Sequence, residues 1–181
     1  MSGSALTFYF KEIFPTKETF KEYLTEFEIV DITDAENLIF AEYLFKVIFR
    51  KYHNSNVQYD TPEDFKCDLA NILEDSFLKF KRQTELARKT AKLTDEEILT
   101  MTTALANSAN NPNSKPVDPT KPFEYVGAQA YTIANNGKLQ GYLQALNNIP
   151  TLLIDEILLS CRGLFKTFIP NQIYIYRGEQ L

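Results

Sequence analysis

The spacing of apolar and polar positions along the chain predicts a mainly helical protein. Apolar side chains recur every three or four residues over most of the sequence, which places them on one face of a helix. Prolines, glycines and asparagines divide this pattern into separate stretches. We expect helices at about 16–28, 34–52, 62–92, 94–107, 138–146 and 151–168, with Pro150 separating the last two.

Three of these helices begin at a threonine that is followed three residues later by an acid. In such a capping box, the threonine hydroxyl accepts a hydrogen bond from the backbone of the acid, and the acid bonds back to the threonine N–H. The pairs are Thr33 with Glu36, Thr61 with Asp64, and Thr94 with Glu97.

The helix expected at 34–52 is apolar over an unusually wide arc. Its polar stripe consists only of Glu42, Lys46 and Arg50, spaced four residues apart. A helix of this kind has to be covered on more than one side. It is therefore either the central helix of the domain or a helix at an interface.

The helix that begins after Thr61 contains no glycine or proline beyond Pro62 until about residue 92. At 1.5 Å per residue it would be about 45 Å long, and we expect it to project beyond its own core. Its second half is basic, and the acidic start of the next helix should fold back against it. This basic run is either solvated surface or a contact with DNA phosphates or an acidic partner. Its cations are Lys79, Lys81, Arg82, Arg88, Lys89 and Lys92.

Residues 107–134 should form an extended strap or loop, because prolines and turn-forming asparagines interrupt any helix there. The sequence after 135 returns to helix and ends in a β-prone aromatic tail, at 173–176. We therefore expect one domain with arms: a helical bundle at 1–106, the strap at 107–134, and C-terminal helices with a tail at 135–181. At the other end of the chain, residues 6–10 form a short aromatic stretch that could be an extended segment.

Charge is divided unevenly between the two halves of the chain. Residues 1–78 have 7 Lys/Arg against 15 Asp/Glu, a net of −8, and residues 79–181 have 12 against 9, a net of +3, which together give the total of −5. This asymmetry suits end-to-end contact between copies or with a charged partner. The net acidity argues against a protein that coats nucleic acid over its whole surface.

The residues that usually perform catalysis are scarce. The chain has one histidine, His53, and two distant cysteines, Cys67 and Cys161, so a four-ligand zinc site is not expected. No phosphate-binding glycine loop is found. We interpret His53 as a cation that is stabilised at a helix C-terminus. The paired acids at 96–97 and 155–156 are explained by helix starts. We predict no catalytic, cofactor or metal site, and no membrane span.

The whole chain, in its order of elements, resembles the small neck proteins of tailed bacteriophages. The similarity lies in a compact helical first half, the strap at 110–122, the segment 125–131, and then helices with a β-prone tail. Such head-completion or head–tail connector proteins, including those of crAss-like phages, form rings, usually of twelve copies, beneath the portal. The resemblance implies a structural virion protein of the neck, made in the bacterial host cytoplasm, around a channel for double-stranded DNA.

The resemblance also implies roles for particular residues. The helices at 34–53 and 61–93 would build the ring wall, the strap and residues 171–181 would be docking arms, and the basic run would face the portal or the DNA. The implied interface residues are Phe40, Phe45, Phe49, Pro112, Pro116, Pro119, Pro122, Phe123, Tyr125, Ile173, Tyr174, Ile175 and Tyr176.

Two other functions fit the same sequence. A small helical enzyme of unknown chemistry would need a deep pocket with strongly shifted titratable groups. A helical regulator of DNA or of a partner protein would need a short recognition helix with base-reading side chains. The lone histidine argues against the first, and the lysine-rich character of the basic run argues against the second.

Overall fold

The computed structural model describes residues 5–110, 119–124 and 128–165, and it confirms a mainly helical fold. The elements run in the order β1 (Leu6–Tyr9), α1 (Phe10–Ile13), α2 (Lys17–Glu26), α3 (Ala35–Tyr52), β2 (Asn56–Tyr59), α4 (Pro62–Ala91), α5 (Asp95–Ala109), α6 (Ala128–Ala134), α7 (Gly137–Cys161) and the 3₁₀ turn η1 (Arg162–Leu164).

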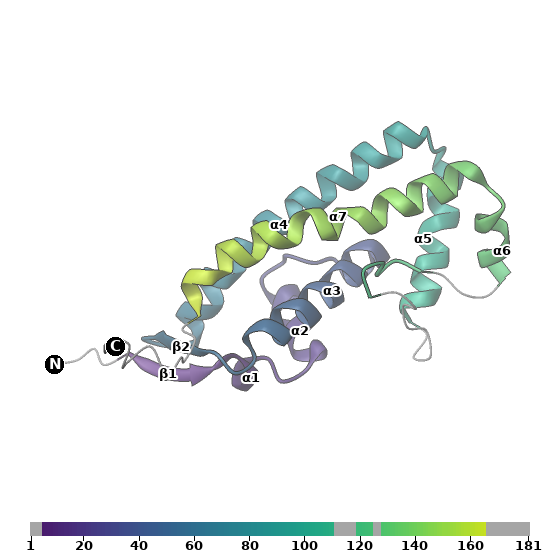
Figure 1. The fold of residues 1–181 in the computed structure, drawn as a ribbon. Coiled ribbons are helices and arrows are strands. Elements are labelled where there is room, and N and C mark those ends of the chain that lie inside the picture. The colour runs from purple at the N-terminus through teal and green to yellow at the C-terminus, as the bar shows by residue number, and fades with distance from the viewer. Residues whose placement is uncertain (1–4, 111–118, 125–127, 166–181) are drawn as a thin grey trace, which may run out of the picture.

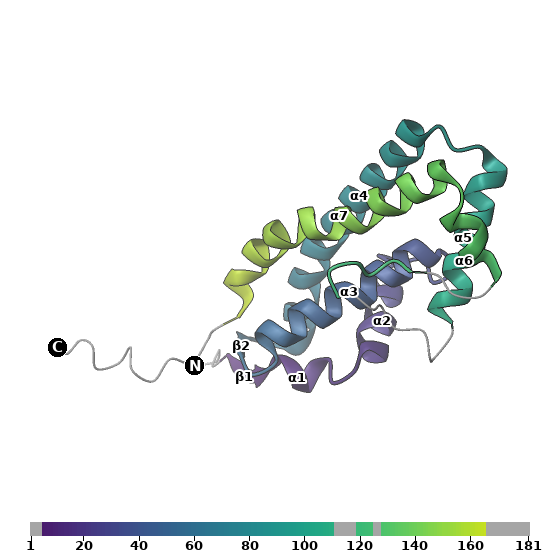
Figure 2. The same ribbon diagram turned by 45° about the vertical axis from the view of Figure 1, so that its right-hand side comes forward.

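The two longest helices, α4 and α7, lie antiparallel along one another and form the upper layer in Figure 1. Helix α3 lies beneath them, and α2 packs against α3 and reaches the first half of α4, where the Tyr23 hydroxyl donates to the Lys66 carbonyl (Figure 2). The expectation that α4 projects beyond the core is wrong, because α7 accompanies it along its length. One continuous set of buried apolar side chains connects these layers.

Helix α7 is continuous where the sequence predicts two helices. Pro150 lies inside it, although proline removes one backbone hydrogen bond and crowds the carbonyl four residues before it. Leu146, Ile149 and Leu153 are buried on the side that packs against the rest of the protein. This burial, which local propensity does not include, offsets the cost of the proline.

The helix starts agree with the capping analysis fully at one position, in one of the two expected bonds at a second, and not at the third. Thr94 and Glu97 form the expected reciprocal pair, and the Thr61 hydroxyl accepts a bond from the Asp64 N–H at 3.1 Å. The predicted box at Thr33 is wrong. Asp34 caps α3 instead and accepts bonds from the N–H groups of residues 36 and 37, which leaves the Glu36 side chain free for a different contact.

A two-stranded antiparallel sheet closes the end of the molecule at which α4 begins. The extended segment expected near residue 6 is β1, and it pairs with β2 in the register Leu6 to Tyr59. The sequence predicts only a turn at the start of β2, because Asn54 and Asn56 both favour turns. Phe65 of α4 makes ring contacts with Phe8 and Tyr59, and these contacts join the sheet to the core.

The last described part of the strap is fixed to the body of the protein. Phe123 is buried, and its backbone N–H donates to Asn147 Oδ1 at 2.7 Å. Asn147 Nδ2 in turn donates to the Phe123 carbonyl at 3.1 Å. The amide of Asn147 thus replaces the missing backbone partner of an extended segment. This part of the strap is held by its own chain, whereas the resemblance implies that the strap is a docking arm.

Candidate functional site

The three phenylalanines of α3 that the resemblance assigns to subunit contacts lie against the protein's own core. Phe40 is fully buried, and its ring stacks on Phe80 with centroids 4.2 Å apart. Phe45 and Phe49 are half-buried and touch each other. Phe40 is therefore core, and its assignment to an interface is wrong, because a residue covered on all sides by its own chain offers no surface to another.

The remaining predicted arm residues lie in different places. Pro119 is exposed and Pro122 is half-buried beside Phe123. Seven other residues fall outside the described part of the chain: Pro112, Pro116, Tyr125, Ile173, Tyr174, Ile175 and Tyr176.

The six cations of the basic run separate into two that face other helices and four that face solvent. Lys79 forms ion pairs with Asp75 and with Glu156 of α7. Arg88 points toward α3 and pairs with Glu36 at 2.7 Å. Lys81, Arg82, Lys89 and Lys92 are exposed, and none of them forms an ion pair among the residues that the structure describes.

The four exposed cations share the outer side of α4 with two leucines. Leu78, with 48% of its surface exposed, and Leu86, with 57%, are spaced so that Arg82 lies between them on one side of the helix. We call the set Leu78, Lys81, Arg82, Leu86, Lys89 and Lys92 the basic face. It combines positive charge with exposed apolar surface, and Glu85 is the one acid within this stretch.

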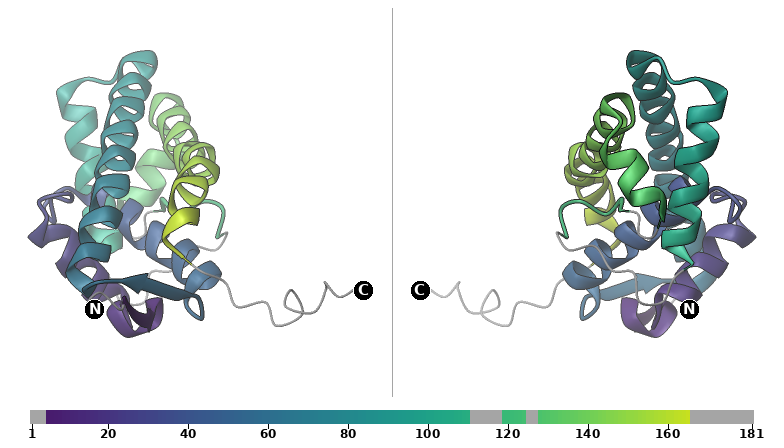
Figure 3. Two further views of the ribbon diagram at one scale, coloured as in Figure 1. Left: turned by 90° about the vertical axis from the view of Figure 1, so that its left-hand side faces the viewer. Right: turned by 90° about the vertical axis from the view of Figure 1, so that its right-hand side faces the viewer.

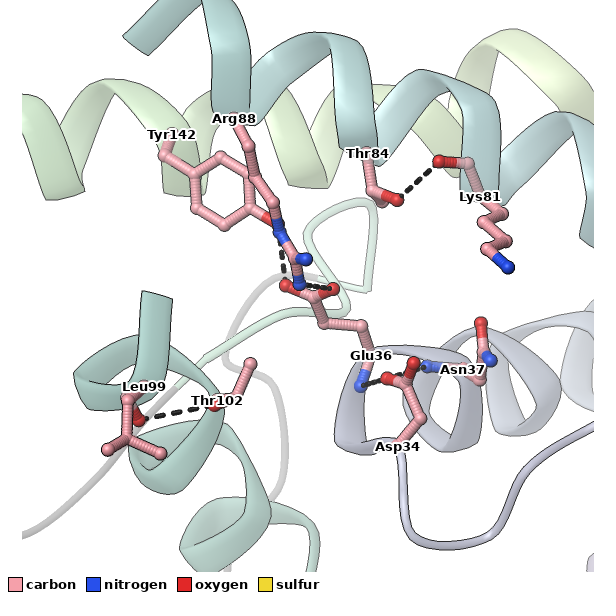
Figure 4. A network of polar contacts seen from close by, with 9 residues as sticks. All are labelled: Asp34, Glu36, Asn37, Lys81, Thr84, Arg88, Leu99, Thr102 and Tyr142. Atoms are coloured by element: carbon pink, nitrogen blue, oxygen red, sulfur yellow. Dashed lines mark hydrogen bonds and ion pairs between the residues drawn. The ribbon is translucent and has the colours of Figure 1, made fainter. Parts of the chain in front are cut away.

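A buried polar network lies under the basic face and joins α3, α4 and α7 (Figure 4). Tyr142 donates from its hydroxyl to Glu36 Oε2 at 2.6 Å, and the Arg88 guanidinium donates to Glu36 Oε1 at 2.7 Å. The Glu36 side chain is only 3% exposed. Sequence reasoning missed this network, although Glu36 has the same helical phase as the buried Phe40, four residues later, and that position could have indicated it.

Burial sets the electrostatics of the network. It raises the pKa of Glu36 above its ordinary value, against the opposing effects of the Tyr142 hydrogen bond and the Arg88 charge. Burial, together with the neighbouring Glu36 carboxylate, also raises the pKa of Tyr142. The carboxylate has both oxygens occupied by protein donors and almost no exposed surface. The arrangement therefore suits a cross-link between helices better than proton transfer to a substrate.

A shallow groove between α4 and α7 contains the other charged cluster. Ile72, Leu153 and Ile157 contribute its apolar lining. Lys79 is bonded there to Glu156 and Asp75, and these hydrogen bonds raise its pKa. The ammonium group therefore stays charged near neutral pH and cannot act there as a general base.

The remaining candidates for chemistry have local structural partners. The His53 ring lies within 2.9 Å of the Phe49 carbonyl through Nδ1 and within 3.0 Å of the Asn54 amide through Nε2. Both contacts are made within the end of α3 and the turn after it, so the His53 ring has local structural partners. Cys161 is buried, which raises the pKa of its thiol to about 12, and Cys67 is exposed.

The paired acids serve as helix-start and surface groups. Glu97 caps α5 and accepts a bond from Lys138 of α7 at 2.7 Å, and these bonds lower its pKa. The acidic start of α5 follows the basic end of α4 directly, as expected, but α5 packs against α3 and Glu97 pairs with Lys138 at the start of α7, so α5 does not fold back along the basic run. Asp155 and Glu156 lie in the last third of the continuous α7, so the expectation that they belong to a helix start is wrong.

The described residues contain neither a cluster suited to a metal ion nor a helix suited to a membrane. No group of three His, Cys, Asp or Glu side chains is placed to hold a metal ion. None of the helices described combines the length and the apolar character needed to cross a membrane.

Comparison with known proteins adds no relative to this description. No family model, no curated protein and no solved structure matches the chain.

Proposed function

We propose that this chain is a structural subunit that works as part of a larger assembly, through the basic face of α4. The observation that carries the proposal is the exposure of Leu78 and Leu86 among four cations that have no acidic partner within the described residues. Exposed apolar surface with a charged rim is typical of a protein–protein contact. Binding to duplex DNA would gain affinity from the cations, which contact phosphates, but not from the exposed leucines.

The resemblance to connector ring proteins specifies the kind of assembly that we propose. The chain would form a closed ring between portal and tail in the neck of a phage particle, around the DNA channel. Its role would be mechanical, and affinity would come from many weak contacts that act together. A monomer with an acidic and a basic side is suited to such a ring, because head-to-tail contacts close when their rotation allows it.

Replacing the two leucines by glutamine tests this proposal. Leu78→Gln with Leu86→Gln should abolish assembly and leave the melting temperature unchanged, since both side chains are already exposed. Native mass spectrometry of the wild type and the variant, alone and with a candidate portal protein, measures the first effect. The matched control is Leu99→Gln on α5, where the leucine is also exposed but lies off the basic face.

Either of two results would contradict the proposal. The double variant could assemble and bind the portal protein as well as the wild type does. Alternatively, wild type and variant could both stay monomeric and bind duplex DNA equally, with a steep dependence on salt. The second result would favour the DNA-binding regulator.

A further inference from the structure

Helix α2, in the acidic half of the same chain, carries a row of glutamates that could contact the basic face. Glu18, Glu22 and Glu26 follow one another at intervals of four residues on α2, so they lie on one side of that helix. All three are exposed, and none forms an ion pair among the described residues. Like charges at this spacing repel one another, so the row does not stabilise its own helix.

Helix α2 separates its charges by side. Its two lysines, Lys17 and Lys21, point toward α3 and pair there with Glu42. The glutamates are left on the side that faces away from that contact. The negative surface of α2 is therefore not neutralised by the helix's own cations.

The acidic surface continues past the end of α2. Glu28 and Asp31 are exposed in the turn that follows, and Ile32 beside them has 58% of its surface exposed. Hydrogen bonds from the Thr33 side chain and backbone lower the pKa of Asp31, so it stays ionised. We call the set Glu18, Glu22, Glu26, Glu28, Asp31 and Ile32 the acidic face. Like the basic face, it combines one sign of charge with exposed apolar surface.

Backbone conformation singles out one residue on each face. Glu28 (φ 58°) and Lys92 (φ 56°) are the only non-glycine residues with positive φ in the described parts of the chain. Each follows the end of a helix, where glycine is the residue usually favoured. At both positions a charged side chain occupies a place that backbone preference alone would give to glycine, with opposite signs on the two faces.

The two faces cannot meet within one molecule. Helix α2 packs against α3 and contacts α4 near its start, where the Tyr23 hydroxyl donates to the Lys66 carbonyl, whereas the basic face lies on the second half of α4 (Figures 1 and 2; Figure 3 shows the same body from two further sides). The acidic face is on α2 and the turn after it, and the basic face is on the outer side of the second half of α4. Two different, complementary surfaces that lie apart on one protein can pair between copies in a head-to-tail contact.

We propose that the basic face of one copy docks on the acidic face of the next copy. This inference rests on the proposed function and names the contact through which the assembly would grow. The cations of one copy would meet the glutamates of its neighbour, and the exposed leucines would lie near Ile32. Because the two surfaces differ, a copy that has docked through its basic face still has its acidic face open to a further copy. The same contact can therefore repeat from copy to copy.

Charge exchange between the two faces is the direct test. In the first variant, Arg82→Glu and Lys89→Glu reverse the basic face, and in the second, Glu18→Lys and Glu22→Lys reverse the acidic face. Each variant alone should associate roughly a hundredfold more weakly than the wild type, because like charges would face one another. A chain with all four changes, and an equal mixture of the two variants, should both regain assembly.

The controls separate this contact from general effects of charge. Lys46→Glu with Arg50→Glu changes the same number of charges on the exposed stripe of α3, and it should leave assembly unchanged. If a reversed variant fails to fold, Arg82→Gln with Lys89→Gln removes the charge without adding repulsion, and it should also weaken assembly. Sedimentation velocity gives the association, and thermal unfolding confirms that each variant is folded.

Each outcome supports or overturns the proposal. If the wild type assembles but both reversed variants assemble equally well, or the mixture does not recover, the contact is overturned while the proposed function stands. If the reversal of the basic face alone abolishes binding to duplex DNA and leaves self-association intact, the face serves DNA instead. If the wild type never associates with itself or with the portal protein, both the contact and the proposed function fail.

Discussion

Arg88→Met should lower the free energy of unfolding by about 3 kcal/mol, because it leaves a buried carboxylate without its cation. Glu36 has 3% of its side chain exposed, and Arg88 supplies the only charge-compensating contact to it among the described residues. The Tyr142 hydroxyl would still donate one hydrogen bond, which offsets part of the loss. Urea unfolding of the variant and the wild type measures the difference.

The pH dependence of this loss follows from the direction of the Glu36 shift. Burial already raises the pKa of Glu36 above 4.5, and removal of Arg88 would raise it further. A carboxyl group whose folded-state pKa is raised stabilises the folded state below its unfolded pKa, and that stabilisation is lost as the pH rises through the folded pKa. The deficit of Arg88→Met should therefore be smallest below pH 4.5 and largest near neutrality.

The neighbouring residue provides a matched control for the arginine. Lys89→Met removes one positive charge from an exposed position on the same helix turn, and it should change stability by less than about 0.5 kcal/mol. Equal losses in the two variants would show that the Glu36 network contributes nothing beyond surface charge. Glu36→Gln combined with Arg88→Met should recover part of the loss, because the uncompensated charge is then gone.

Phe40→Ala should lower the free energy of unfolding by about 3–5 kcal/mol, a loss similar to that of Arg88→Met, because it opens a cavity at the centre of the protein. The Phe40 ring is fully buried between Phe80, stacked at 4.2 Å, and Phe77, in edge contact at 5.0 Å. Thermal or urea unfolding gives the loss. Tyr131→Ala is the surface control, since Tyr131 is 78% exposed, and we expect no comparable effect there.

This experiment also decides between two roles for Phe40. A core residue lowers stability when it is truncated, whereas an interface residue lowers association and leaves the melting temperature of the monomer intact. A Phe40→Ala protein that melts like the wild type but no longer assembles would restore the interface assignment that the resemblance implied.

The helices could be predicted from the sequence where periodicity and capping agree. Helix α4 combines a regular apolar stripe with Thr61 and Pro62 at its start, and the prediction is confirmed to within a residue at each end. Pro150 misled the same reasoning, because its local cost is visible in the sequence and the burial around it is not. The partner of β1 was missed for a similar reason, since strand pairing depends on residues about fifty positions apart.

The candidate site was only partly predictable. The basic run was found from composition, but composition does not tell which side of a helix meets another element. Arg88 and Lys79 belong to contacts between helices, whereas Arg82 and Lys89 face solvent. The network around Glu36 joins residues 36, 88 and 142, and only the packing of three helices brings them together.

Self-assembly is tested most directly by the mass of the wild-type protein in solution as its concentration is raised. We expect reversible association beyond the 20.9 kDa monomer, strongest at low salt and weakened as salt screens the two charged faces. Sedimentation velocity at low and high ionic strength measures both effects. A protein that stays monomeric at every concentration and ionic strength, and that does not bind a candidate portal protein, would rule out a role as a subunit of a larger assembly.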